Sequence, residues 1–409
     1  MHDSSLINLI IFVISGLVAL NALSYYSGRL MLFPSVIWVL CLGIICGALK
    51  HCELLHLPEL SLDPNIILFA MVPVLIFAAT KKMCLHHFRQ VLKEATILAT
   101  LGIVISMVAV AFALHWGFQV PWLESLLFGV IVSATDPIAV SAILHEAKNI
   151  SAERKMLIEG ESILNDGFVV AVFATLSVML FGTEEINLTL SGGKLVVNII
   201  GALVLGIALG RLARLLLRVW KNKAASLTVN ITLALAFASF LIAETLHFPG
   251  VLAVFAGALA FGYRPDEDNA QIHVAQENVW DYLEYIVNSI LFFLLGASFF
   301  SQASLQIITI TFVVISVVML FMSRFIALGI LGPLLRIERE KITHQDFWLL
   351  NYSGSRGAIS IALILLLPDD FSYKPLFLTT AFVMVLVSLV AYPIFLKMVL
   401  NDQSEVYAD

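Results

Sequence analysis

Apolar runs recur along the whole chain, and they restrict its fold more than any other feature does. Each run could cross the hydrocarbon core of a bilayer as an α-helix, which needs about 20 residues. The 409 residues are 60% hydrophobic and only 13% charged, whereas about a quarter of the residues in a typical soluble domain are charged. A transmembrane β-barrel would show shorter segments of alternating hydrophobicity. The sequence therefore predicts an all-α polytopic membrane protein.

About thirteen membrane spans can be drawn on these apolar runs. The first, near residues 5–24, has no basic start and no small-residue cleavage site, so we expect a retained span and not a signal peptide. The later expected spans cover residues 32–49, 63–80, 93–114, 121–144, 156–181, 195–217, 225–244, 248–262, 277–299, 304–332, 346–367 and 375–397.

The charged residues predict which way the chain crosses the membrane. If the N-terminus lies outside, eighteen Lys and Arg residues fall at cytoplasmic ends of spans and three at outer ends. Because cytoplasmic loops collect basic residues, this split predicts an outer N-terminus and a cytoplasmic C-terminus. The two remaining basic residues, Arg324 and Arg356, lie inside spans, where a charge is costly and needs a partner. Three acidic residues near span ends, Glu159, Asp281 and Glu284, are interpreted as interfacial.

The sixth expected span contains the polar sequence LIEGESILNDG, residues 157–167. Glu161 and Asn165 are four residues apart and share one stripe of the helix, and Ser162 and Asp166 share another. Because a helix turns about 100° per residue, Glu161 and Asp166 point roughly 140° apart. One carboxylate can therefore lie in a fixed salt bridge while the other faces a cavity. The alternative is that these polar pairs only specify helix packing.

Two spans are expected to be broken near their middle. In the fifth, VSATDPIAV places Asp136 before Pro137, which cannot donate a backbone hydrogen bond and suits the first turn of a new half-helix. In the twelfth, NYSGSRGAIS has glycines on both sides of Arg356 and predicts an unwound stretch, which is tolerated at this depth only inside protein or beside a cavity. Asp136 could neutralise positive N-terminal helix ends there, and Arg356 negative C-terminal ends.

Discontinuous helices near mid-membrane indicate a transport site. The alternative is a simple proline kink in one span and a tight glycine contact in the other. The two breaks lie seven spans apart, an odd number, so two related halves with this offset would face opposite ways, as in an inverted repeat.

Six motifs then carry a resemblance to a known family. ATDPIAV, EGESILNDG, FPGVLAVFAGALAFG, NSILFFLLGA, FMSRFIALG and GSRGAISIAL occur in this order, and as a set they resemble the monovalent cation:proton antiporter-1 family. That family includes the NhaP-type sodium/proton antiporters and the eukaryotic sodium/hydrogen exchangers. The resemblance implies one transmembrane transporter domain, residues 1–409, that forms a homodimer. It also implies a mobile core bundle, 93–181 with 304–400, and a dimerisation bundle, 5–80 with 195–299.

The resemblance also implies roles for residues at the two breaks and in the sixth span. Asp166 matches the aspartate that binds the cation or the proton, and Asn165 matches the preceding residue, which is Asn in the electroneutral branch. Thr135 and Ser162 match positions that lend oxygen atoms to the transported Na⁺, together with Asp166. Asp136 matches the aspartate of the crossed region, which is also assigned to the binding site.

Glu161 and Arg324 match a buried structural ion pair of the family. Two positions depart from the family's pattern. Ala78 stands where some members have an acidic residue in the third span, so a ligand from that position is not expected. The usual Gly-Gly-Leu-Arg-Gly reads Ser-Gly-Ser-Arg-Gly at residues 353–357, which keeps Arg356.

The function that this reasoning predicts is secondary transport, not enzyme catalysis. Na⁺ or Li⁺ would exchange for H⁺ by alternating access, with both competing for Asp166 and with electroneutral 1:1 exchange if only this carboxylate changes its cargo. The protein would be a multi-pass component of a bilayer, in a bacterial inner membrane, with no cofactor, no nucleic-acid partner and no large cytosolic regulatory tail. One alternative is a K⁺/H⁺ or broader monovalent cation exchanger. A more distant one is a non-transporting membrane sensor or scaffold.

Overall fold

The computed structural model describes residues 35–52, 63–136, 138–147, 150–182, 188–219, 225–262, 270–302, 310–337 and 340–406. The first expected span, near 5–24, and Pro137 lie outside these residues. The described part of the chain is mostly helical, with one two-stranded antiparallel hairpin formed by β1 (Arg336–Ile337) and β2 (Glu340–Lys341).

Each of the other twelve expected spans contains a helix, which confirms the predicted all-α membrane fold. The α-helices are α2 (Ser35–His51), α3 (Val72–Lys82), α4 (Leu85–Ile97), α5 (Ile103–Phe118), α6 (Trp122–Ser133), α7 (Ile138–Glu146), α8 (Ala152–Phe181), α9 (Leu188–Val219), α10 (Ala225–Thr245), α11 (Gly250–Phe261), α12 (Ala270–Gln302), α13 (Ile310–Leu331), α14 (His344–Ser353), α15 (Ala358–Leu365) and α16 (Lys374–Val406). Seven helices in the described part are long and apolar enough to cross a membrane, by length and composition.

Three short helical segments extend or connect these helices. The π-helical turn η1 (Ile66–Met71) leads into α3, and η2 (Leu98–Gly102) joins α4 to α5 in one helix, Leu85–Phe118. The 3₁₀ turn η3 (Gly332–Leu334) ends α13. The helix around η2 begins eight residues before its expected span at 93–114, because the amphipathic helix α4 continues into the apolar part without a break.

Two expected spans are discontinuous, as the sequence predicts. The fifth consists of α6, which ends at Ser133, and α7, which begins at Ile138. The twelfth consists of α14, which ends at Ser353, and α15, which begins at Ala358. Proline at one break and glycine at both edges of the other make continuous helix unfavourable.

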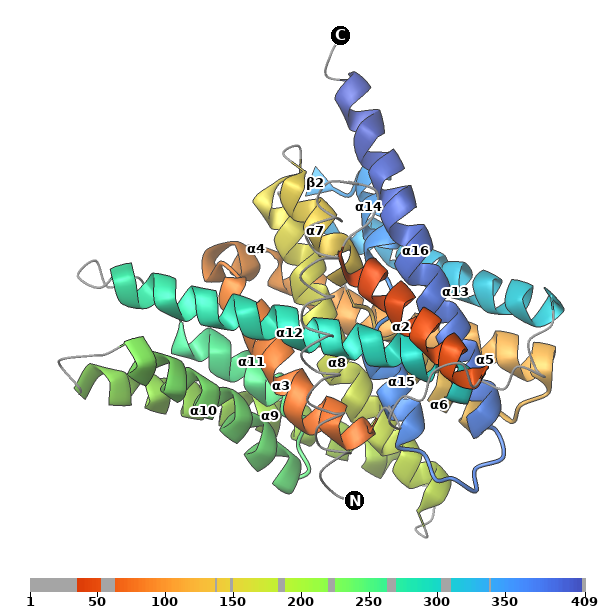
Figure 1. Cartoon of the computed structure of the whole chain (residues 1–409), viewed down its shortest axis with the longest axis horizontal. Coiled ribbons are helices and arrows are strands. Elements are labelled where there is room, and N and C mark those ends of the chain that lie inside the picture. Colours follow the sequence, from red (N-terminus) through yellow and green to blue (C-terminus); the bar gives the residue numbers. More distant parts are fainter. Residues whose placement is uncertain are drawn as a thin grey trace.

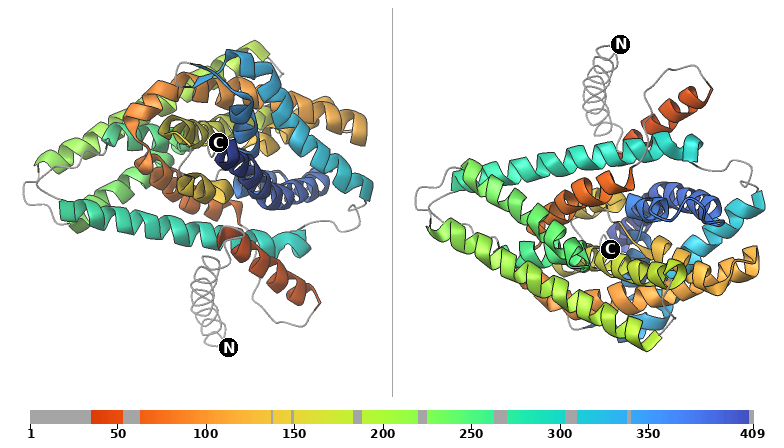
Figure 2. Two further views of the ribbon diagram at one scale, coloured as in Figure 1. Left: turned by 90° about the horizontal axis from the view of Figure 1, so that it is seen from above. Right: turned by 90° about the horizontal axis from the view of Figure 1, so that it is seen from below.

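The long helix α8 runs through the middle of the molecule, between two groups of helices (Figure 1). It contacts α4, α6 and α15, and also α3, α9 and α11. In one group α12 packs against α2, and α9 packs against α11; α12 and α9 lie along opposite edges of the molecule (Figure 2). In the other group α5 packs against α6 and α13, and α16 packs against α13, α14 and α15. A side chain on α8 can therefore lie between the two groups.

Glycines bring α2 and α12 into backbone contact. A Cβ atom on Gly43 would lie 2.3 Å from the carbonyl oxygen of Phe293, and one on Gly296 would lie 2.4 Å from the carbonyl oxygen of Leu40. Small residues allow membrane helices to approach this closely and to gain van der Waals contact. The long α12 is therefore fixed against α2 along its C-terminal half.

Candidate functional site

The two helix breaks are joined to each other by hydrogen bonds. The backbone N–H of Asp136 donates to the carbonyl oxygen of Ser355 at 2.7 Å, and the Ser355 hydroxyl donates to the carbonyl oxygen of Asp136. The Asp136 carboxylate accepts from the backbone N–H of Ile138 at 3.0 Å, so it caps the positive N-terminal end of α7. A Cβ atom on Gly357 would lie 2.5 Å from the Asp136 side chain, so this position has room only for glycine.

The point where the two breaks meet is called the crossing. Arg356 lies there, in the break between α14 and α15, and is 1% exposed. Its Nη1 donates to the carbonyl oxygen of Ser133, the last residue of α6, at 2.8 Å. Its Nη2 donates to the hydroxyl of Ser323 at 3.1 Å. Its backbone N–H donates to the hydroxyl of Ser388 at 2.9 Å. The guanidinium therefore faces the negative C-terminal end of α6, where a positive charge is favourable.

Glu161 and Arg324 form a bidentate ion pair in the interior. Arg324 Nη1 lies 2.8 Å from Glu161 Oε1, and Nη2 lies 3.0 Å from Oε2. The two residues are 1% and 5% exposed. Arg324 Nη2 also donates to the carbonyl oxygen of Leu350 at 3.2 Å. Charge-assisted bidentate pairs have strict geometry, so this pair fixes α8 and α13 to α14.

The remaining polar side chains of α8 hold the first break in place. Asn165 Nδ2 donates to Thr135 Oγ1 at 2.9 Å, and the Ser162 hydroxyl donates to the Thr135 carbonyl oxygen at 2.6 Å. All three residues are buried. Asn165 acts here as a donor, which an ionised aspartate at the same position could not do.

Asp166 differs from these residues because its unpaired oxygen belongs to a carboxylate; the amide oxygen of Asn165 is also unpaired among the described residues. The residue is 7% exposed, and Oδ1 has no hydrogen-bond partner among the described residues. Asp166 lines a cavity of about 310 Å³ together with Asp136 and Ser162. An unpartnered buried carboxylate oxygen carries a large desolvation cost, so this wall of the cavity can accept a cation or a proton.

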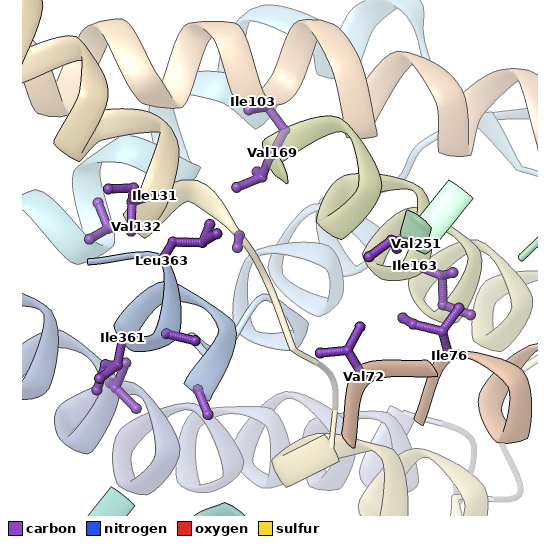
Figure 3. Packing of buried hydrophobic residues seen from close by; sticks show 14 of the residues in the cluster. Val72, Ile76, Ile103, Ile131, Val132, Ile163, Val169, Val251, Ile361 and Leu363 are labelled. Atoms are coloured by element: carbon purple, nitrogen blue, oxygen red, sulfur yellow. The ribbon is translucent and has the colours of Figure 1, made fainter. Parts of the chain in front are cut away.

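The cavity has an apolar part and a polar part. Val72 and Ile76 of α3 and Ile163 of α8 belong to its apolar wall, and Figure 3 shows them among the buried hydrophobic side chains. Ala78, at the position where the family has an acidic residue in some members, is buried in the core.

The structure brings three of the expected ligands, Asp166, Asp136 and Ser162, to one cavity. Thr135 and Asn165 do not appear in its wall but pair with each other beside it. Five polar residues that sequence reasoning did not assign to the site also line it: Lys82, Ser141, Glu159, Glu284 and Asn288. The interfacial interpretation of Glu159 and Glu284 is therefore incomplete, because both side chains reach this cavity. A signal existed in the four-residue spacing of Glu284 and Asn288, which places them on one face of α12.

No group of three or more His, Cys, Asp or Glu side chains in the described ranges could hold a resident metal ion.

Comparison with known proteins decides the family. The family described as "Sodium/hydrogen exchanger, transmembrane" has a model that matches residues 5–402. The chain belongs to the sodium/hydrogen exchanger family. This membership confirms the resemblance to monovalent cation:proton antiporters and places the exchanger among multi-pass proteins of the cell membrane.

Curated relatives are similar over most of this exchanger's length. It is 28% identical over 407 residues to the Na(+)/H(+) antiporter NhaH of Halobacillus aidingensis, covering 94% of this chain and 96% of NhaH. It is 29% identical over 394 residues to Sodium/hydrogen exchanger 8 of Arabidopsis thaliana, covering 89% of this chain but only half (50%) of the plant protein. Against ApNhaP of Aphanothece halophytica it is 30% identical over 318 residues, which cover 75% of this chain and 59% of ApNhaP.

A solved structure is similar in fold. The sodium proton antiporter MjNhaP1 from Methanocaldococcus jannaschii superposes with a TM-score of 0.73, at 17% sequence identity and with 98% of each chain covered. The relatives are named antiporters and exchangers, which are transporters and not enzymes. Family membership supports cation/proton exchange as the general activity of this exchanger.

Proposed function

We propose that this protein exchanges Na⁺, or Li⁺, for H⁺ across the membrane, and that the two ions compete for Asp166. The observation that carries the proposal is the unpaired Oδ1 of Asp166, buried at the wall of a cavity. An isolated buried carboxylate is unfavourable, and either a proton or a cation removes its uncompensated charge. A proton and a cation bound to the carboxylate together would leave an excess positive charge, so Asp166 binds only one of the two ions at a time.

The oxygen atoms around Asp166 suit a small alkali cation as ligands. Ser162 and Asp136 line the same cavity and supply hydroxyl and carboxylate oxygens, which hard cations prefer. The role that we propose for Thr135 is weaker than the sequence suggested, because its Oγ1 and its carbonyl oxygen already accept hydrogen bonds from Asn165 and Ser162. Either oxygen of Thr135 can coordinate the cation only through a second lone pair, while it keeps the hydrogen bond that it already accepts.

The charges near Asp166 support an electroneutral exchange of one cation for one proton. Glu161 is neutralised by Arg324, Glu284 is paired with Lys82, and Asn165 is uncharged. Asp136 caps the N-terminal end of α7. Asp166 is then the carboxylate that changes its cargo during the cycle. The membrane potential would do no net work on such a cycle.

We propose that access alternates through movement of a core bundle, 93–181 with 304–400, against a dimerisation bundle, 5–80 with 195–299, and that two copies assemble as a homodimer. The cavity supports this division, since Asp166 and Ser162 come from α8 of the core, while Val72 of α3 and Asn288 of α12 come from the other bundle. A small shift between the bundles would open or close the cavity beside Asp166.

The test is proton flux in proteoliposomes, driven by Na⁺, Li⁺ or K⁺ gradients, with the membrane potential set at several values. We expect flux with Na⁺ and Li⁺ that does not depend on the potential. Flux with K⁺ alone would favour the K⁺/H⁺ alternative, and a steep dependence on the potential would contradict the 1:1 stoichiometry. Absence of flux with all three cations would contradict exchange itself.

A further inference from the structure

A polar stripe on α12 leads from the surface into the Asp166 cavity. Asp281, Glu284 and Asn288 are spaced three and four residues apart, so they share one face of the helix. The side chains of Asp281 and Glu284 are 57% and 24% exposed, and Asn288 is 8% exposed. Exposure thus falls steadily along the stripe, and its two inner members line the same cavity as Asp166.

A cationic group already occupies the outer part of this stripe. Lys82 Nζ, from the C-terminal end of α3, lies 2.7 Å from Glu284 Oε2 and 3.1 Å from Asp281 Oδ1. The Lys82 side chain is 46% exposed. Partly exposed ion pairs contribute little to stability, so another monovalent cation can replace this ammonium group at small cost.

Asn288 supplies an independent sign of a ligand. Its Oδ1 is buried and, within the described part of the chain, makes no hydrogen bond. Buried polar atoms in folded proteins are nearly always satisfied, and a neutral amide oxygen is a good ligand for a hard cation. Asn288 lies one helical turn inward from Glu284, so the two side chains are neighbours on the surface of α12.

We propose that Glu284 and Asn288 form a second, outer binding subsite for an alkali cation on its way to Asp166, and that the Lys82 ammonium is a tethered competitor for it. The inference rests on the proposed exchange at Asp166. An entering cation displaces Lys82 from Glu284, is held by the Glu284 carboxylate and the Asn288 amide oxygen, and then passes to Asp166. Lys82 lowers the occupancy of the subsite, and Asp281 holds the displaced ammonium nearby.

The first experiment measures the Na⁺ concentration that gives half-maximal proton flux. Lys82→Gln is expected to lower this concentration and Glu284→Gln to raise it, each by roughly two- to fivefold, as expected for one partly exposed charge contact. Asn288→Ala should also raise it, because it removes a neutral oxygen ligand. The Lys82→Gln effect should shrink as ionic strength rises, because salt screens the exposed part of the site. Glu340→Gln, which removes an exposed acid on β2, is the matched control and should leave the value unchanged.

Two results of this experiment would overturn the inference. One is a wild-type half-maximal concentration in all three cavity variants. The other is a shift in the same direction for Lys82→Gln and Glu284→Gln, which would indicate a structural role for the ion pair and not competition.

A second experiment separates the outer subsite from the proposed exchange. In detergent, Na⁺ should still raise the melting temperature of Asp166→Asn, because a ligand stabilises the folded state that binds it. This increase should disappear in Asp166→Asn combined with Glu284→Gln, and it should persist in Asp166→Asn combined with Glu340→Gln. Choline chloride at equal ionic strength serves as the reference salt.

The two proposals can fail separately. If wild-type protein exchanges ions but Asp166→Asn shows no Na⁺-dependent stabilisation, the outer subsite is refuted and the exchange proposal stands. If wild-type protein shows no exchange but Na⁺ still stabilises it through Glu284, the outer subsite is supported and the exchange proposal is refuted.

Discussion

Glu161 and Asp166 lie five residues apart on α8 and have similar burial, at 1% and 7% exposure, but their surroundings differ. Glu161 receives two hydrogen bonds from Arg324. Asp166 has an oxygen without a partner among the described residues and lines a cavity. The two environments support different proposed roles. A fixed counter-charge would keep the Glu161 carboxylate structural, whereas the cavity would leave Asp166 available for the proposed exchange of a cation for a proton.

The largest effect is expected where the exchangeable carboxylate is removed. Asp166→Asn should abolish Na⁺-driven proton flux in proteoliposomes, because the amide cannot take up a proton or supply the negative charge. The variant should still fold, since Asp166 Oδ1 makes no hydrogen bond to the described residues that the substitution would break.

Size-exclusion profile and melting temperature in detergent provide the folding control for Asp166→Asn. Flux at the wild-type rate in well-folded Asp166→Asn protein would remove the distinction between the two carboxylates.

The second effect concerns Glu161, the carboxylate that is paired with Arg324. Glu161→Ala or Arg324→Ala should destabilise the protein by about 3–5 kcal/mol, because each leaves a buried charge without its partner. The measurements are folded yield and melting temperature. Replacing both residues with leucine should recover part of the loss, since no unpaired charge remains. Wild-type melting temperatures in both single variants would show that the pair does not stabilise the fold.

The third effect sharpens the comparison at the crossing beside Asp166. Gly357→Ala places a methyl group 2.5 Å from the Asp136 carboxylate, so the crossing must shift at an expected cost of about 1–3 kcal/mol. We expect slower flux and a lower melting temperature. Gly329→Ala is the control, because a Cβ atom there would meet nothing within 4 Å. Equal behaviour of the two alanine variants would contradict a tightly packed crossing.

The smallest effect is expected at an ion pair near the surface. Arg154 Nε lies 2.6 Å from Asp346 Oδ1, with side chains 25% and 5% exposed. Because the arginine is partly solvated, Arg154→Met should cost only about 1 kcal/mol, far less than Arg324→Ala. Melting temperatures of the two variants measure this difference. An equal loss in both would mean that exposure does not separate these pairs.

Much of the fold could be predicted because it depends on local sequence. Apolar runs mark the spans, and Pro137 and the glycines beside Arg356 mark the two breaks. Helical spacing alone was enough to predict that the Glu161 and Asp166 side chains point in different directions. The family followed from motifs in order, and the family match at residues 5–402 confirms it.

The parts that could not be predicted depend on contacts between distant residues. Lys82 meets Glu284 across 202 positions in the sequence, so local reasoning could only interpret Glu284 as interfacial. Asn288 lies within an apolar motif, and its place in the cavity depends on how α12 packs against α3. The outer orientation of the N-terminus and the division into two bundles stay predictions.

The central claim is that a proton and a cation compete for Asp166. Its most direct test is the proton release that accompanies Na⁺ binding to purified protein in weakly buffered detergent, followed with a pH indicator. The account predicts about one proton released per cation bound by Glu284→Gln protein, which lacks the proposed outer subsite, at a pH where Asp166 is protonated. It predicts none from Asp166→Asn combined with Glu284→Gln. Saturable Na⁺ binding to Glu284→Gln protein at that pH without proton release, or equal release from the double variant, would contradict it.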